Sequence, residues 1–335
     1  MKKTTLTLGL CSLWLAGGTA AFAQESRFTW EGSLEVGVDS TVDADDSSAE
    51  LSDTYLTLEA AFEAALTDRI SVFGELTLES VTDAEDDRAF EDLGLYLNQL
   101  GLRFAFGETF VSVGKISPVF AVAWDAAPGY YGTTLAEDYE LSEMIGVSVD
   151  TPVSAAGGTL SFAAFYADDT ALSDSLGHKR GRNSVDAGGV GNTGKLNNFA
   201  IQYTQTFGDT EAWVGARHLS AGTGDESDET GIVAGLTHDF GNGFDMIGEV
   251  AHFNGAGGAD ADATYVTFGG AYGVDDWTFS AVATLIDSDE DTDSMLALGV
   301  DRAINEQLEV NFGVARFDVG GEKSTSVGVA AVLSF

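Results

Sequence analysis

From residue 28 to residue 335 the sequence is a succession of segments in which apolar and polar residues alternate. In the first segment Phe28 and Trp30 fall on one side, while Glu31 and Glu35 fall on the other. Successive side chains of a β-strand point to opposite faces, so a period of two indicates strands with one apolar and one polar face. Because the pattern continues along almost the whole chain, we expect an all-β fold.

Sixteen such segments can be delimited, and most have the ~9–11 residues that a tilted strand needs to cross a bilayer. They are residues 28–39, 51–66, 70–80, 90–106, 110–116, 140–150, 159–167, 196–207, 211–220, 230–240, 244–253, 264–274, 277–286, 294–303, 308–317 and 324–335. No linker or change of composition separates them. We therefore predict one antiparallel domain over residues 24–335.

The connections between these segments alternate between long and short. The long set is 40–50, 81–89, 117–139, 168–195, 221–229, 254–263, 287–293 and 318–323, and the short set is centred on 68, 108, 151–158, 208–209, 241–243, 275–276 and 304–307. Short turns at one end and longer loops at the other are typical of transmembrane β-barrels. A sheet in hydrocarbon must close to pair its backbone groups, and sixteen strands enclose a lumen too wide for side chains to fill. The pattern predicts a water-filled 16-stranded transmembrane β-barrel.

The first 23 residues have the three parts of a secretory signal peptide. Lys2 and Lys3 form the positive region, residues 6–15 form a short apolar run, and Ala21-Phe22-Ala23 is a small-x-small cleavage site. The alternative is a buried N-terminal helix. The single cysteine, Cys11, lies in this peptide, so the mature chain would contain no thiol and no disulfide.

The charge of the chain is strongly acidic. Acidic residues outnumber basic ones 54 to 15, and the formal net charge is −39. Cleavage after Ala23 would remove Lys2 and Lys3 but no acid, which leaves 13 basic against 54 acidic residues and a charge of −41. Such a field repels phosphate, so nucleic-acid binding is excluded. An acidic surface could also be a solubility adaptation to salt.

Residues 110–147 resemble the third-loop region of Gram-negative porins. In that family a strand that ends near a Gly-basic pair leads into a long loop that folds into the barrel and narrows it. Here Gly114-Lys115 ends a strand, and Pro118, Trp124, Pro128-Gly129 and Gly132 suit a compact, bent loop. The terminal Phe335 is similar to the C-terminal aromatic residue that the barrel-assembly machinery recognises in that family. The resemblance implies a bacterial outer-membrane protein and a homotrimer.

Candidate constriction residues follow from this loop and from basic residues in strands. A ring of carboxylates at a narrow point attracts cations, so Asp125, Glu137, Asp138 and Glu140 are the candidate acids, although they could instead be solvated acids on the outer rim. Arg103 and Lys115 are candidate basic residues of the lumen, because a charge facing lipid is costly. Enteric porins place an arginine cluster opposite the loop, and few basic residues are available here to form one.

Two further groups of charged residues occupy the long connections. Acid-rich stretches at 43–50, 82–89, 224–230 and 287–293 could bridge to lipopolysaccharide through divalent ions, or they could simply be hydrated loops. A basic island within 168–195, with His178, Lys179, Arg180, Arg182 and Lys195, could contact an anionic ligand, the sugar phosphates of lipopolysaccharide, or a neighbouring acidic loop.

The leading functional hypothesis is an outer-membrane porin for passive diffusion of small hydrophilic solutes and ions, with a preference for cations. One alternative is a channel biased towards a sugar or an iron chelate, in which Trp124, Tyr130 and Tyr131 would form a ligand track. A weaker alternative is an outer-membrane hydrolase. No nucleophile, zinc or phosphate-loop motif is present, so we expect no enzyme activity and no cofactor.

Overall fold

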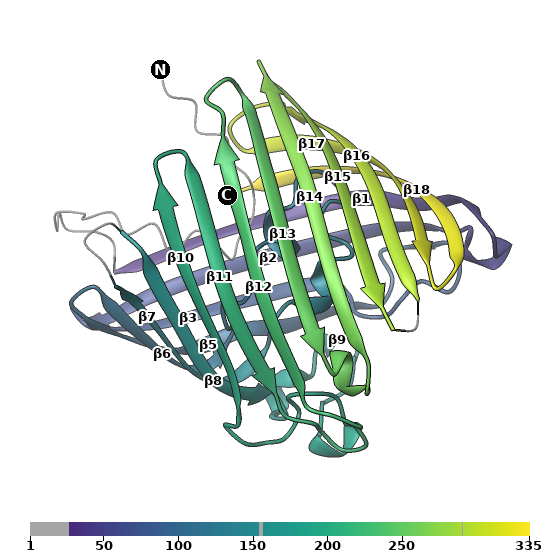
Figure 1. Cartoon of the computed structure of the whole chain (residues 1–335). Coiled ribbons are helices and arrows are strands. Elements are labelled where there is room, and N and C mark those ends of the chain that lie inside the picture. The colour runs from purple at the N-terminus through teal and green to yellow at the C-terminus, as the bar shows by residue number, and fades with distance from the viewer. Residues whose placement is uncertain (1–26, 154–156, 290) are drawn as a thin grey trace.

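The computed structural model describes residues 27–153, 157–289 and 291–335, and the expected signal peptide lies outside this range. Sixteen long strands dominate the described residues (Figure 1). They are β1 (Phe28–Ala44), β2 (Ser52–Thr67), β3 (Ile70–Ser80), β5 (Leu93–Phe106), β6 (Thr109–Ile116), β7 (Met144–Pro152), β8 (Thr159–Ala167), β10 (Asn198–Phe207), β11 (Thr210–Leu219), β12 (Glu229–Asp239), β13 (Phe244–Asn254), β14 (Asp262–Val274), β15 (Trp277–Ser288), β16 (Thr292–Ala303), β17 (Leu308–Val319) and β18 (Glu322–Ser334).

The remaining elements are short and lie in the connections. They are the strands β4 (Arg88–Ala89) and β9 (Leu176–Gly177), the helix α1 (Ala123–Ala126), and the 3-10 turns η1 (Ser47–Ala49), η2 (Glu137–Tyr139), η3 (Ala171–Ser173), η4 (Val185–Ala187) and η5 (Ala256–Gly258). Among the described residues no helix is long and apolar enough to span a bilayer.

The sheet closes on itself. Each long strand pairs antiparallel with the next, and β18 pairs with β1 from Ser33↔Ser334 to Ala44↔Ser324. In Figure 1 the amino-terminal strands pass behind β10 to β17, and together they surround the barrel interior. Since closure removes every edge, each strand can pair on both sides, as hydrocarbon requires. The prediction of a 16-stranded antiparallel barrel is confirmed.

Some predicted boundaries were wrong by a few residues. The predicted strand 140–150 begins only at Met144, because Glu143 has a φ of 55° and interrupts the extended backbone. The fourth predicted strand likewise begins at Leu93 rather than at residue 90, after Asp92 with a φ of 55°. Left-handed residues of this kind end a strand, yet neither is a glycine, so composition does not reveal them.

Two connections expected to be long are short. Strand β17 continues to Val319 and β18 begins at Glu322, which leaves only Gly320 and Gly321 between them, with φ of 59° and 78°. Two glycines with positive φ form the hairpin turn that matches the twist of its strands. Strands β15 and β16 also extend further than predicted, to Ser288 and from Thr292.

The barrel wall is completed by a segment from a distant loop. Strand β6 has eight residues, whereas its neighbour β5 has 14. The unpaired outer part of β5 is partly covered by β9, whose Gly177 and Leu176 pair with Gly94 and Leu95. The gap exists because the chain leaves the wall after Ile116 and enters the barrel.

Candidate functional site

The segment from residue 117 to residue 143 lies inside the barrel. It contacts Gln202 of β10, Glu249 of β13, Ser280 of β15 and Tyr55 of β2, which belong to walls all round the barrel. One short segment can contact strands on all these sides only from within. The inward-folded loop that the resemblance implied is therefore present, and we call this segment the inner loop.

Glu249 holds both limbs of the inner loop. Its carboxylate accepts hydrogen bonds from the backbone N–H of Val122 at 2.8 Å and of Ala123 at 3.1 Å. It also accepts from the hydroxyl of Tyr139 at 2.7 Å and from the indole N–H of Trp213 at 2.6 Å. Three of these donors belong to the inner loop and the fourth to β11, so this one side chain of β13 fixes the loop to β11 and β13.

A buried arginine reinforces this attachment. Arg217 of β11 pairs with Glu229 at 2.7 Å and donates to the carbonyl of Tyr139 at 2.7 Å. Its guanidinium also lies over the rings of Phe120 and Phe253, 4.9 and 4.4 Å from their centroids. The cation is thus matched by a carboxylate and two aromatic faces, and it stabilises the loop rather than facing open water.

The tip of the inner loop lies in a trough of small residues. Ser280, Gly299, Gly313 and Gly328 are direct cross-strand neighbours on β15, β16, β17 and β18. A Cβ on Gly313 would lie 2.6 Å from Cβ of Tyr130, and a Cβ on Gly328 would collide with the same ring. The register of four strands therefore creates the space that the tip occupies.

Two tyrosines of the inner loop, Tyr130 and Tyr131, contact the wall formed by β1 and β2. The hydroxyls of Tyr130 and Tyr55 are 2.8 Å apart, and Tyr131 donates to Asp39 at 3.0 Å. Trp124, by contrast, donates to the carbonyl of Phe120 within the loop at 3.0 Å. The three aromatic residues suggested as a ligand track thus have structural contacts of their own.

The opposite wall, made by β1, β2 and β3, carries carboxylates. Glu35 and Asp39 share one face of β1, and cross-strand pairing places Glu59 on the same inner side. Glu59 lies close enough to Glu75, Glu79, Glu35 and Asp125 for their charges to repel its own. The sequence offered few basic residues to form the arginine cluster that enteric porins place opposite the loop, and this chain has a row of glutamates there.

The predicted loop acids face this row. Glu140 experiences the charges of Glu137 and Asp125 from the loop and of Glu75 from the wall. Burial, followed by these neighbouring carboxylates, raises the pKa of Glu140 to about 7. Desolvation likewise raises the pKa of Glu137.

Asp138 lies in the same turn of the inner loop, and its side chain is exposed. It accepts a hydrogen bond from Tyr265 at 3.3 Å, and partial desolvation inside the barrel raises its pKa. The four predicted loop acids therefore occupy the inner loop, inside the barrel.

The predicted basic residues are ion-paired. Arg103 of β5 is 2.5 Å from a carboxylate oxygen of Glu63 on β2. Lys115 has no exposed surface, and its ammonium lies 2.6 Å from Glu143 and 2.9 Å from Asp168. Lys115 thus belongs to the junction where the inner loop leaves the wall, and it does not border the open lumen.

The basic island also has partners within the chain. Arg180 donates twice to Glu143 and lies over the ring of Tyr96, 4.0 Å from its centroid. Lys179 pairs with Asp174 at 2.9 Å. Arg180 therefore fastens this loop to the barrel, whereas Lys179 pairs with an acid of the same loop. The described residues contain no group of three or more acids or histidines arranged to hold a metal ion.

Phe335 follows the end of β18 and meets the first strand. Its backbone N–H donates to the carbonyl of Gly32, and its carbonyl accepts from the N–H of Gly32, both at 3.0 Å. Its ring lies 5.3 Å from that of Trp30. The last residue thus takes part in the pairing that closes the sheet.

Sequence reasoning did not identify Glu249, Trp213 or the glycine trough. One available signal was the presence of apolar residues on the inner side of later strands, such as Val282 and Ile286 in β15, which are buried. An inward-facing apolar residue in a water-filled barrel needs a covering segment, and the inner loop contributes to that cover.

The family comparison matches the described architecture. A family model described as Gram-negative porin matches residues 10–322. No curated protein sequence matches the chain. Solved structures provide similar folds at low sequence identity.

Three of these structures are representative. The outer membrane channel DcaP of Acinetobacter baumannii is 13% identical, with a TM-score of 0.66, covering 92% of this chain and 97% of that one. An anion-selective porin from Comamonas acidovorans is 14% identical, with a TM-score of 0.61, covering 93% and 100%. A triple mutant of Rh. blastica porin is 18% identical, with a TM-score of 0.59, covering 92% and 100%. The chain belongs to the Gram-negative porin family, and it is a diffusion channel of the bacterial outer membrane rather than an enzyme.

Proposed function

We propose that this channel passes small hydrophilic solutes and ions by passive diffusion and prefers cations. The observation that carries the proposal is the acidic character of both sides of the constriction. From the inner loop, Glu140 lies within electrostatic reach of Glu75, Glu137 of Glu79, and Asp125 of Glu59, and these three glutamates belong to the wall. Carboxylates at a narrow point attract cations and repel anions.

The ion pairing of the basic residues supports the same preference for cations. Arg103, Lys115 and Arg217 each lie within ion-pair distance of a carboxylate. An ion pair has little net field at a distance, so these residues contribute little attraction for anions. A similar fold in Comamonas acidovorans is named anion-selective, which indicates that side chains rather than the barrel decide the sign.

The test of this proposal is the reversal potential of the purified protein in a planar bilayer under a KCl gradient. We expect a potential of the sign that cation permeation gives. The preference should weaken as salt rises, because exposed charges are screened over ~10 Å at 0.1 M salt. It should persist at high salt, since the constriction acids act at short range. A potential of the opposite sign would overturn the proposal.

We also propose that the chain is exported and assembled as its resemblance implies. Cleavage after Ala23 would leave a mature chain that begins at Gln24, which amino-terminal sequencing of the membrane protein tests. Deletion of Phe335 should lower the amount of assembled barrel, because this residue pairs with Gly32 and packs on Trp30. Undiminished heat-modifiable barrel in the deletion strain would contradict the assembly role.

We propose a homotrimer surrounded by lipopolysaccharide and other outer-membrane lipid. Large apolar side chains are exposed on the barrel, among them Phe199, Ile232, Phe268, Leu296 and Leu298. Apolar outer walls can contact lipid or one another, and closed symmetry is the usual form of such assemblies. Unheated protein should migrate at about three times the mass of the heated chain. A monomer by light scattering in several mild detergents would count against the trimer.

A further inference from the structure

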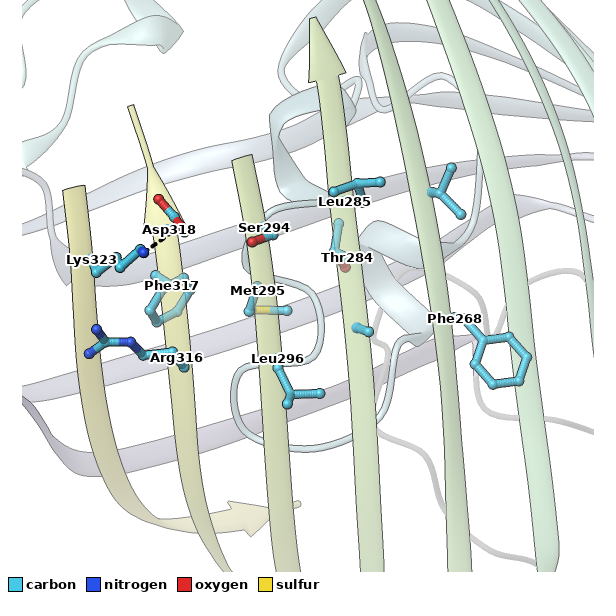
Figure 2. Close-up of a pocket in the computed structure, with 12 residues that line it drawn as sticks. Phe268, Thr284, Leu285, Ser294, Met295, Leu296, Arg316, Phe317, Asp318 and Lys323 are labelled. Atoms are coloured by element: carbon cyan, nitrogen blue, oxygen red, sulfur yellow. Dashed lines mark ion pairs between the residues drawn. The ribbon is translucent and has the colours of Figure 1, made fainter. Parts of the chain in front are cut away.

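A groove of about 680 Å³ opens on the barrel over strands β14 to β18 (Figure 2). Its first row of residues consists of direct cross-strand neighbours on β14 to β17, namely Phe268, Ala283, Leu296 and Arg316. A second row continues one step further along, with Val266, Leu285, Ser294, Asp318 and Lys323.

These two rows lie on the outer wall. The inner faces of β15, β16 and β17 are marked by Ser280, Gly299 and Gly313, which adjoin the inner loop. Ala283, Leu296 and Arg316 each lie three residues beyond one of these, and an odd separation turns a side chain to the opposite face. Leu296 is 57% exposed and Phe268 58% exposed, as expected for a surface without a partner in the chain.

The groove lies at the extracellular end of this wall. Ser294 is the third residue of β16, and Asp318 and Lys323 flank the tight hairpin between β17 and β18. This hairpin is on the side of the longer loops, opposite the short periplasmic turns. The groove therefore faces the outer leaflet.

Its two halves differ in chemistry. Over β14 to β16 the lining is mainly apolar, with Thr284 and Ser294 as its polar residues, and the small side chain of Ala283 leaves a low point between Phe268 and Leu296. Over β17 and β18 the lining carries two cations, Arg316 and Lys323, and one acid, Asp318. Figure 2 shows the apolar and cationic side chains arranged across neighbouring strands.

The two cations are held only by exposed pairs. Arg316 uses its Nη1 atom to bond Asp43 at 3.0 Å and Thr325 at 2.6 Å. Lys323 is 3.7 Å from Asp318. The side chains of both pairs are substantially exposed, and pairs of this kind contribute little to stability, so a phosphate can compete for the same nitrogens.

We propose that this groove binds one outer-leaflet lipid whose phosphate-containing headgroup has a net negative charge. Its acyl chain lies over Ala283 between Phe268 and Leu296, and its phosphate binds Arg316 and Lys323. A lipid is the expected occupant because the wall faces hydrocarbon and because the cations complement a phosphate at the level of the headgroups. The proposal locates a site for the lipid partner proposed above and is independent of ion selectivity.

The test uses the full mature protein, purified in detergent, freed of lipid and examined by native mass spectrometry. Dilauroyl phosphatidylglycerol and dilauroyl phosphatidylcholine serve as probes with the same chains and different net charge. We expect one bound phosphatidylglycerol per chain, at least about fivefold tighter than phosphatidylcholine, because charge-assisted bonds to a monoanionic headgroup are stronger. Equal affinity for the two lipids would overturn the role of the cations.

Matched variants locate the site. Ala283→Phe fills the low point and should abolish the bound lipid, whereas Ala281→Phe, on the same face two residues away, should retain it. Arg316→Gln with Lys323→Gln should remove the preference for phosphatidylglycerol, whereas Arg302→Gln at the other end of β16 should leave it unchanged. If both phenylalanine variants retain the lipid, or if both glutamine sets behave alike, the groove is not the site.

A second copy of the chain is the competing occupant. The only natural cysteine is Cys11 in the expected signal peptide, so Ala283→Cys gives a mature chain with a single thiol. Disulfide-linked dimers formed in the membrane by this variant, and not by Ala281→Cys, would replace the lipid with a protein contact and overturn the proposal. Heat-modifiable mobility on gels confirms that each variant is folded before binding is compared.

Discussion

The inner wall of the barrel has two halves that differ in what they face. On β10 to β18 the inner loop covers much of the wall, and Trp213, Val282 and Ala297 are buried there. On β1 to β5 the inner face is polar and half-buried, with Glu59 and Glu75 among its residues. One half is a protein core placed inside a channel, and the other half lines the open path.

This difference separates two tasks that charged residues perform. In the covered half Glu249 and Arg217 are surrounded by donors, acceptors and rings, so their charges serve to position the loop. In the open half the carboxylates lie near one another and near the loop acids. Changes in the first half should therefore alter pore geometry and stability, whereas changes in the second half should alter selectivity.

The largest effect is expected from Glu249→Ala. Four donors lose their acceptor, and each unsatisfied buried donor costs about 1–3 kcal/mol. We expect an unfolding midpoint clearly below that of the wild type in a denaturant titration, and open-channel current with added flicker from a loosened loop. Glu211→Ala, which removes an exposed glutamate of β11, is the matched control. Quiet, unaltered channels in Glu249→Ala would show that the loop has other sufficient anchors.

A smaller effect is expected from Gly328→Ala in the trough. The new methyl group would collide with the ring of Tyr130, and overpacking of this kind costs about 1–3 kcal/mol. Displacement of Tyr130 from the wall should narrow the lumen and lower the single-channel conductance. Gly248→Ala, whose Cβ would make only a 3.7 Å contact, should leave conductance unchanged. Identical single-channel conductances in the two variants would show that the position of the inner loop does not depend on the space at Gly328.

The loop acids should affect selectivity without affecting the fold. Replacement of Asp125, Glu137 and Asp138 by amides should reduce the cation preference at both low and high salt, because these acids lie inside the barrel. Replacement of Asp287, Asp289 and Asp291 at the outer hairpin should matter mainly at low salt, since screening weakens distant charges. The permeability ratio obtained from reversal potentials measures the cation preference of both variants. If the two variants lose the same amount of cation preference at high salt, the loop acids do not lie at the constriction.

The smallest effect is expected from pH. The pKa of Glu140 is raised to about 7, so this carboxyl is largely neutral a unit below that value and largely charged a unit above it. The cation preference should therefore increase as pH rises through 7. Glu140→Gln should make the profile flatter over the same range. A cation preference that falls as pH rises would contradict a role for the ionised Glu140 carboxylate.

The sequence sufficed for the barrel because alternation, strand length and loop parity are local properties. Each segment such as 159–167 carries its own signal, and β8 has those same bounds. The loop was also accessible, since Pro128-Gly129 and Gly132 are unusual outside a tight bend.

The attachment of the inner loop to the wall could not be predicted from the sequence in the same way. The trough forms only if Gly299, Gly313 and Gly328 are direct cross-strand neighbours, and that depends on the register of three separate strands. Glu249 also appears in sequence as one more inward-facing acid, similar to Glu75. Only the fold reveals that Glu249 anchors the inner loop, whereas Glu75 accepts from Gln99 and Asn98 of β5 and lies within reach of other carboxylates.

The central claim is that carboxylates of the open half decide what passes. Its most direct test is the reversal potential, under one KCl gradient, of the wild type and of the triple variant Glu59→Gln, Glu75→Gln and Glu79→Gln. We predict a cation-selective wild type whose preference falls strongly in the triple variant, while its conductance remains that of an intact pore. An anion-selective wild type, or a triple variant as cation-selective as the wild type, would contradict the account.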